Sequence, residues 1–382
     1  MTEPLLNGLS WLLLIGGLLF FVAGSIGLLR FPDTVSRLHA LTKADTLGLG
    51  LVIAGVCCCW PPAPRRANCW RGRPARSHAM TEWLFDGVLG LLVLGLAFGA
   101  LHGRNLYASV LLFIAFGLAL ALIWARLGAA DLALAEAAIG AGLTGVLLFT
   151  ALSRQPGPAD LPEATGTRLR LGAAAVVLPM LILLVQGLAP LSEVEPRLPA
   201  LITRHLDETG VSHPVTAVLL NYRAWDTLLE LAVLLLALLG ARQLGPRPLA
   251  FAEPWPLLRA WARVLAPLLV LAAGYILWRG ASAPGGAFQA GALLASGVVL
   301  LRLSGLLPRL RWSFMPLRLL VLGGLLVFVG VAVATAWLGE GWLTYPGGAA
   351  KPIILMIETV ATLSIAASLS LLVVGEGEEV SS

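Results

Sequence analysis

Charged residues are scarce in this chain. Only 12% of its 382 residues are Asp, Glu, Lys or Arg, whereas soluble domains carry about 25%. Hydrophobic residues make up 58%, which excludes a soluble globular protein and predicts an integral membrane protein. The basic residues stand between apolar runs and are not interleaved with aromatic residues. The net charge of +5 therefore reports orientation in the membrane and does not indicate binding to nucleic acid.

Cysteine is equally scarce. The chain has four cysteines, and they form no pair of CxxC motifs at zinc or iron–sulfur spacing: Cys57, Cys58, Cys59 and Cys69. Gly140, Gly142 and Gly145 match a dinucleotide fingerprint in form, but they lie inside an apolar run with no preceding strand, so a nucleotide site is rejected. We expect no metal site and no small-molecule cofactor.

Long apolar runs dominate the chain. About eleven are long enough to cross roughly 30 Å of hydrocarbon, near 7–29, 44–60, 84–101, 106–126, 131–152, 170–190, 224–241, 259–279, 286–303, 317–338 and 352–374. The first run lacks a basic leader and is too long for a signal peptide, so we expect it to be retained. The prediction is an all-α polytopic membrane bundle of about eleven transmembrane helices with no soluble domain.

The distribution of arginine between these runs predicts an orientation. The positive-inside rule places the amino terminus outside the cell and the acidic tail 376–379 in the cytoplasm, with the chain in the inner (plasma) membrane. One segment, 61–78, breaks the rule because it carries five arginines on the outer side.

Three acidic residues lie within apolar runs: Glu136, Glu230 and Glu358. A carboxylate in a bilayer costs roughly 2.5–3.5 kcal/mol even on lenient insertion scales, unless it is protonated or partnered. Chains that only need to span a membrane rarely carry such residues, whereas chains that move protons or cations often do. These residues therefore predict proton or ion translocation. The alternative is a structural carboxylic acid bonded to a neighbouring helix.

The connection between the first two runs is dense in polar side chains, which include Asp33, Arg37, His39, Lys43 and Asp45. Residue by residue, a solvated loop with a helix cap would explain them, and Asp45 near a helix start suits the helix dipole. As a whole, the string at 27–48 resembles the G subunit of Mrp-type multisubunit Na⁺/H⁺ antiporters. The resemblance covers residues 7–60, without the third helix of that subunit.

A second motif lies at residues 127–143. Asp131 stands at the mouth of a helix and is predicted to cap it. Glu136 lies about one and a half turns deeper, flanked by Ala and Gly that leave room for water. Residues 83–152 resemble the D subunit of membrane-bound hydrogenases, which is equivalent to a carboxy-terminal part of the large A subunit of Mrp antiporters.

A third motif places Arg223, Asp226 and Glu230 at positions i, i+3 and i+7 on one helix face. An Arg–Asp pair at the membrane edge with a deeper Glu would form the entrance of a proton relay. An edge ion pair plus one buried acid is the alternative. Residues 153–243 resemble the E subunit of the hydrogenases.

A fourth motif contains Pro284, Gly285, Gly286 and Gln289. Pro and paired Gly permit non-helical backbone, which is tolerated at depth only where it faces protein or a water-filled cavity. Exposed carbonyls and the Gln289 amide oxygen would line a cation path, and a simple tight turn is the alternative. Residues 244–382 resemble the antiporter B subunit, with Glu358 as the acid of that module.

The chain thus divides into modules at 1–60, 83–152, 153–243 and 244–382, with a basic junction at 61–82 that resembles neither neighbour. We hypothesise that the junction arose by fusion or frameshift, and a genuine linker is the alternative.

The resemblance implies a subunit of a secondary transporter, not an enzyme. It would move Na⁺ and H⁺ across the lipid bilayer together with A-, C-, D-, E- and F-like antiporter subunits. Two alternatives remain open: a membrane-arm subunit of an energy-converting hydrogenase or complex I-like oxidoreductase, and a structural scaffold of such a complex.

Overall fold

The computed structural model describes residues 76–103, 105–153, 197–244, 254–308, 310–338, 341–346 and 348–375, with isolated positions at 12–16 and 171–186. The chain divides into two compact units, Met1–Phe85 and Asp86–Ser382, and nearly all of the described helices belong to the second unit. Apart from the isolated positions, the predicted helices at 7–29, 44–60 and 170–190 lie outside the described residues. So do Asp33, Arg37, His39, Lys43 and Asp45.

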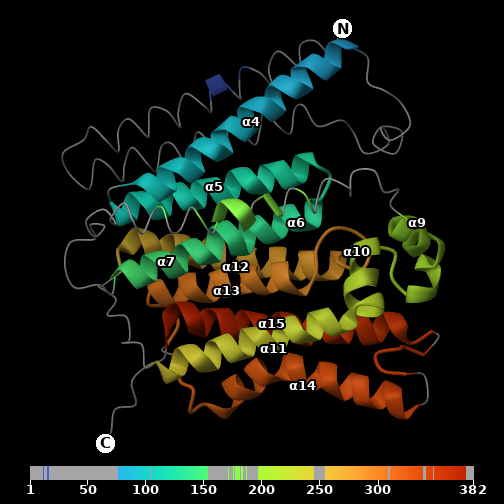
Figure 1. Ribbon diagram of the computed structural model, residues 1–382. Coiled ribbons are helices and arrows are strands. Elements are labelled where there is room, and N and C mark those ends of the chain that lie inside the picture. Colours follow the sequence, from blue (N-terminus) through green and yellow to red (C-terminus); the bar gives the residue numbers. More distant parts are fainter. Residues whose placement is uncertain are drawn as a thin grey trace, which may run out of the picture. The chain divides into compact units, whose positions relative to one another are not determined.

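Helices make up the described part of the second unit (Figure 1). Its first half contains α4 (Arg76–His102, which begins in the first unit), α5 (Leu106–Arg126), α6 (Ala130–Ala135), the π-helix η3 (Glu136–Leu143), α7 (Thr144–Ser153) and α9 (Arg197–Arg204). There follow η5 (Leu206–Thr209), α10 (Pro214–Ala217), the π-helix η6 (Val218–Tyr222), α11 (Ala224–Gln243), α12 (Pro256–Arg279), α13 (Ala287–Leu303), α14 (Met315–Trp337) and α15 (Ala350–Val374).

The predicted membrane helices are confirmed wherever the structure describes them. Seven stretches are long and apolar enough to span a bilayer: Trp83–His102, Leu106–Arg126, Ala130–Ser153, Ala224–Gln243, Pro256–Arg279, Met315–Trp337 and Ala350–Val374. The shorter apolar helix α13 corresponds to the predicted run 286–303. Prolines in the first turns of α12 and α14 suit helix starts, where an N–H would lack an intrahelical partner anyway. The protein is an all-α membrane protein.

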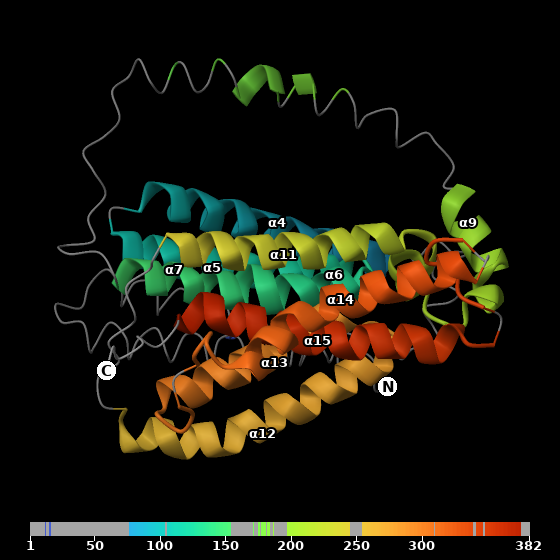
Figure 2. The ribbon, with the colours of Figure 1, turned by 90° about the horizontal axis from the view of Figure 1, so that it is seen from below.

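Helix α15 lies at the centre of the second unit. It packs against α13 and α14 and also contacts α11, α12 and α7, and Figure 2 shows it beside α13 and α14. The apolar window of α15 is 78% buried, whereas no other candidate span exceeds 33%. Elsewhere in the unit, α5 packs against the continuous run of α6, η3 and α7. Most residues of α15 are therefore shielded from lipid by this chain itself.

Small residues allow α14 and α15 to approach closely, as is common between helices in lipid. A Cβ atom placed on Gly324 would lie 2.8 Å from the Cβ of Ser364 and 3.3 Å from the Cα of Ala361. Ser364 donates a hydrogen bond of 2.5 Å to the carbonyl of Val321 on α14. The contact is thus made by backbone and short side chains that cannot move aside.

Replacing Gly324 by Val is expected to lower the midpoint of thermal unfolding of the purified complex, because overpacking costs about 1–3 kcal/mol. Gly330→Val on the same helix is the matched control, since nothing lies within 4 Å of a Cβ atom there. Both variants replace Gly by Val within α14, so they change the helix propensity by the same amount. An equal loss of stability in the two would therefore contradict the close packing of α14 on α15.

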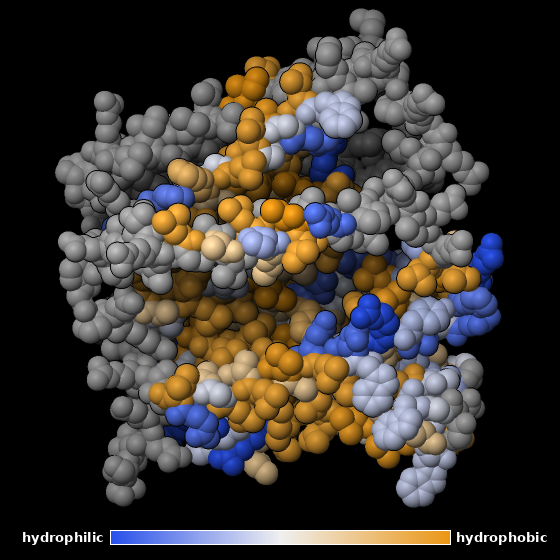
Figure 3. Space-filling model, viewed as in Figure 1, coloured by the Kyte–Doolittle hydropathy of each residue, from blue (hydrophilic) through white to orange (hydrophobic). Residues whose placement is uncertain are grey.

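Apolar side chains cover much of the outer surface. In Figure 3 hydrophobic side chains spread over the face formed by α11 and α14, and hydrophilic ones gather toward its ends. Exposed apolar residues on these helices include Leu229, Val233, Leu236, Leu319 and Leu326. An apolar surface of this extent is stable against hydrocarbon or another subunit, not against water.

Several connecting segments meet at one end of the bundle. The Tyr345 hydroxyl donates a hydrogen bond of 2.7 Å to the carbonyl of Leu220, and a Cβ atom on Gly210 would lie 2.8 Å from the Cβ of Ala350. Burial raises the pKa of the Tyr345 phenol, so it stays protonated and keeps donating. These contacts place residues 205–223 at the same end of the bundle as Tyr345 and Ala350.

Candidate functional site

The connection between α12 and α13 is a tight, non-helical turn. Gly286 has a φ of +125°, a conformation that favours glycine, and its N–H donates 3.3 Å to the carbonyl of Ile276. A Cβ atom on Gly285 would lie only 2.4 Å from that same carbonyl oxygen. The predicted non-helical backbone is confirmed, and glycine is needed at both positions.

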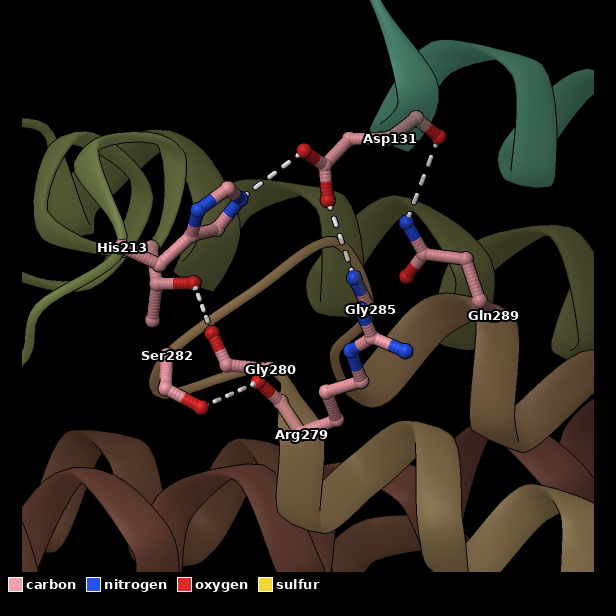
Figure 4. A network of polar contacts seen from close by, with 8 residues as sticks. Asp131, His213, Arg279, Gly280, Ser282, Gly285 and Gln289 are labelled. Atoms are coloured by element: carbon pink, nitrogen blue, oxygen red, sulfur yellow. Dashed lines mark hydrogen bonds and ion pairs between the residues drawn. The ribbon is translucent and has the colours of Figure 1, made fainter. Parts of the chain in front are cut away.

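Asp131 holds this turn from a distant part of the sequence (Figure 4). The Gly285 N–H donates 3.0 Å to Oδ1 of Asp131, and Nε2 of His213 lies 2.9 Å from Oδ2. The backbone carbonyl of Asp131 also accepts a bond of 3.5 Å from Nε2 of Gln289. The Asp131 and His213 side chains are only 15% and 13% exposed. One carboxylate thus joins α6, the start of α10 and the α12–α13 turn.

The prediction that Asp131 caps its own helix is wrong. The cap position of α6 is Ala129, which makes no side-chain bond, and Asp131 lies in the first turn. Its carboxylate bonds to His213 and Gly285 instead, because these long-range partners occupy both oxygens.

The segment before α10 reinforces the junction. The N–H groups of Ser212 and His213 donate 3.0 and 3.2 Å to the carbonyl of Ala281, and the Thr216 hydroxyl donates 2.6 Å to the carbonyl of Gly280. Within the turn, the Ser282 hydroxyl bonds to the carbonyl of Arg279 (Figure 4). The turn is therefore fastened by side chains and backbone from two other segments.

Glu358 lies beneath this turn, in the third turn of α15. The residue is 3% exposed, and its Oε2 is buried without a hydrogen-bond partner. A Cβ atom on Gly286 would lie 3.4 Å from Oε1 of Glu358 and 3.6 Å from Oε1 of Gln289. Both oxygens therefore face the space that Gly286 leaves open. An ionised carboxylate here lacks the full set of bonds that would offset its burial, so the position suits a group that exchanges a proton or a cation.

Glu136 begins the π-helix η3. Its carboxylate lies against its own helix, because a Cβ atom on Gly140 would be only 2.2 Å from Oε1 of Glu136. The predicted room beside Glu136 is thus provided by Gly140 and is filled by the carboxylate itself. π-Helical segments are frequent at functional sites, and the sequence pattern does not predict this one.

The third motif forms its predicted ion pair at the start of α11. Nη2 of Arg223 lies 2.5 Å from Oδ2 of Asp226, with both side chains partly exposed. Glu230, unlike Glu358, is exposed in this chain taken by itself. The structure therefore brings Asp131, Gly285, Gly286, Gln289 and Glu358 together, while Arg223 and Asp226 form a separate pair.

His213 is a site residue that sequence reasoning missed. A His-Pro pair at the start of a helix, after the polar stretch 205–212, was the available signal. Its significance depends on Asp131, which is 82 residues away in the sequence.

Three segments of the chain match known protein families. Residues 13–67 match a family described as "Na+/H+ antiporter subunit". Residues 91–157 match the family of the D subunit of MBH, and residues 257–377 match "Domain related to MnhB subunit of Na+/H+ antiporter". Asp131 lies in the second of these segments and Glu358 in the third.

Two curated relatives match the amino-terminal part. The G subunit of an Na⁺/H⁺ antiporter from Alkalihalophilus pseudofirmus is 56% identical over 41 residues, which are 11% of this chain and 34% of the relative. A UPF0091 protein from Pyrococcus horikoshii is 46% identical over 48 residues, which are 13% of this chain and 47% of the relative. The chain thus spans between a third and a half of the relatives it matches.

Two solved structures were found to be similar to this chain. The Mrp complex from Dietzia sp. DQ12-45-1b aligns with a TM-score of 0.62 and 21% identity, over 92% of this chain and 47% of that chain. The membrane-bound sulfane sulfur reductase, an archaeal respiratory complex, aligns with a TM-score of 0.47 and 26% identity, over 55% of this chain and 97% of that chain. The first likeness shows the fold. The three family matches show that separate segments of this one chain are similar to subunits of Na⁺/H⁺ antiporters and of MBH.

Proposed function

We propose that this chain is a membrane subunit of a multisubunit antiporter that exchanges Na⁺, or another monovalent cation, for protons. The two antiporter-subunit matches support this function. The observation that carries it is Glu358, a carboxylate buried within an apolar helix beside a glycine turn, with one oxygen lacking a partner.

In this proposal the intramembrane carboxylates alternate between protonated and ionised forms. Glu358 releases its proton when a cation or water enters the space over Gly286, and the amide oxygen of Gln289 assists there. Glu136 and Glu230 serve other steps of the path. Arg223, Asp226 and the turn residue Pro284 lie along its entrance. The driving force is the proton gradient.

The chain requires partners in this proposal. It acts in the plasma membrane together with A-, C-, D-, E- and F-like subunits, with its amino terminus outside and its carboxyl terminus in the cytoplasm. Its modules correspond to residues 1–60, 83–152, 153–243 and 244–382, joined through the basic segment 61–82. All three family matches are named for subunits, which supports activity only within a larger complex.

Inverted membrane vesicles test this function. They are prepared from cells that express the whole operon, with or without this chain, and a pH gradient is established before NaCl is added. We expect Na⁺ to collapse the gradient only when the chain is present. Equal Na⁺-dependent collapse without the chain, in a complex whose other subunits still assemble, would contradict the function. Collapse that requires an electron donor would favour a redox-linked complex.

A further inference from the structure

We propose that Asp131 and His213 are positioning residues for Glu358, a role that rests on the proposed function. In this view, Asp131 fixes the Gly285–Gly286 turn and the Gln289 amide against the buried carboxylate, and His213 fixes Asp131.

The first step is the bond between Asp131 and the turn. Oδ1 of Asp131 accepts the Gly285 N–H at 3.0 Å, and the next residue, Gly286, lies against Oε1 of Glu358. The Gly286 backbone is therefore held by two bonds, its own N–H to the carbonyl of Ile276 and the neighbouring Gly285 N–H to Asp131. Because glycine has no side chain to anchor it, loss of the bond to Asp131 leaves the turn freer to move at that point.

The second step is the orientation of Gln289. Its amide has a donor end and an acceptor end. The donor end bonds to the Asp131 carbonyl at 3.5 Å, which leaves Oε1 facing Gly286 on the side of Glu358. If the contact with Asp131 were lost, the amide could turn its NH₂ group toward Glu358 and stabilise the ionised form. The backbone carbonyl at position 131 thus decides which group of Gln289 the buried carboxylate meets, and the side-chain bonds of Asp131 to Gly285 and His213 hold that carbonyl in place.

The third step is the support of Asp131 by His213. The two carboxylate oxygens have different partners, the Gly285 N–H and the His213 ring, so the carboxylate cannot rotate without breaking one bond. The His213 backbone is itself bonded to Ala281 in the same turn. Glu136 lies five residues further along the Asp131 helix, and Arg279 begins the turn. The contacts run from His213 through Asp131 to Gln289, whose amide does not carry protons. They therefore fix the positions of the groups around Glu358 and do not conduct protons.

The residues around Glu358 come from two different family-matched segments of the chain. Asp131 belongs to the segment that matches the D subunit of MBH, and Gly285, Gln289 and Glu358 belong to the MnhB-related segment. His213 lies between the two matched segments. Docking of one segment on the other therefore sets the surroundings of the buried carboxylate.

The test measures the reactivity of Glu358 directly. Dicyclohexylcarbodiimide modifies carboxyl groups in apolar surroundings, and mass spectrometry of the purified whole complex reports the modification rate at each carboxylate. Asp131→Ala, which removes both acceptor oxygens, is expected to change the rate at Glu358 by about tenfold, since small displacements at a reacting group have effects of this order or larger. The exposed Glu230 serves as the internal reference. Asp86→Ala, which removes the ion pair with Arg126, is the matched control and should leave the rate at Glu358 unchanged.

Variants of His213 supply the second measurement. His213→Leu removes the partner of Asp131 and should reproduce the change, whereas His213→Gln keeps an N–H donor and should restore a rate close to that of the wild type. Unchanged labelling of Glu358 in both Asp131→Ala and His213→Leu would overturn the positioning role, even if transport were lost. Loss of assembly in both would also overturn it, because the junction would then be a docking contact alone. The labelling rate does not depend on transport, so failure of the proposed function would be recognised separately.

Discussion

Replacing Glu358 by Gln is expected to abolish Na⁺-dependent proton transport while the complex still assembles. The substitution keeps the size of the side chain and removes its ability to bind and release a proton. Glu358 is 3% exposed and lies against Gly286, so the substitution removes the carboxylate from this buried position. Removal of a proton-transferring side chain commonly reduces rates about a hundredfold or more, and we expect a loss on that scale.

The measurement is the initial rate of Na⁺-induced collapse of the pH gradient in inverted vesicles. Glu208→Gln is the matched control, because Glu208 is an exposed acid at the same end of the bundle with a 77% exposed side chain. Assembly is verified by co-purification of the other subunits. Transport by Glu358→Gln at the rate of the wild type would remove Glu358 from the path and favour a structural role for this chain.

Replacing Gly285 by Ala is expected to produce a second large loss, of transport and of stability together. The added Cβ atom would lie 2.4 Å from the backbone carbonyl oxygen of Ile276, which cannot yield as a flexible side chain would. The turn must therefore shift, and with it the bond between the Gly285 N–H and Asp131. Forced repacking of this kind costs about 1–3 kcal/mol.

Gly274→Ala on α12 provides the comparison, because nothing lies within 4 Å of a Cβ atom at that position. Thermal unfolding of the purified complex should show a lower midpoint for Gly285→Ala and little change for Gly274→Ala. Transport should follow the same order. A Gly285→Ala complex with the stability and transport of the wild type would show that the turn tolerates displacement and that its geometry is not needed.

The helices could be predicted from the sequence because the bilayer imposes a simple requirement. A run of about 20 apolar residues is needed to cross hydrocarbon, and the runs at 106–126 and 352–374 meet it without ambiguity. The α12–α13 turn was also predictable, since Pro284, Gly285 and Gly286 interrupt two apolar runs. The Arg223–Asp226 pair is formed as predicted, but Arg223 is the cap residue before α11 and not part of the helix itself.

The assembly of the site could not be predicted in the same way. Asp131 follows the local rule for a helix cap, yet partners at Gly285 and His213 take both oxygens of its carboxylate. Those partners are 154 and 82 residues away in the sequence, and no local pattern encodes such contacts. The π-helix at Glu136 has no compositional signature either. Candidate residues were therefore predictable, but their arrangement around Glu358 was not.

Proton release on Na⁺ binding by the purified whole complex tests the central claim most directly. It is measured by titrating NaCl into a weakly buffered, detergent-solubilised sample that contains a pH indicator. We predict that Na⁺ releases protons from the wild-type complex, that Glu136→Gln reduces the release, and that Glu358→Gln reduces it most. A release that is the same in the Glu358→Gln complex as in the wild type would show that protons and cations do not compete at the buried carboxylate of this chain.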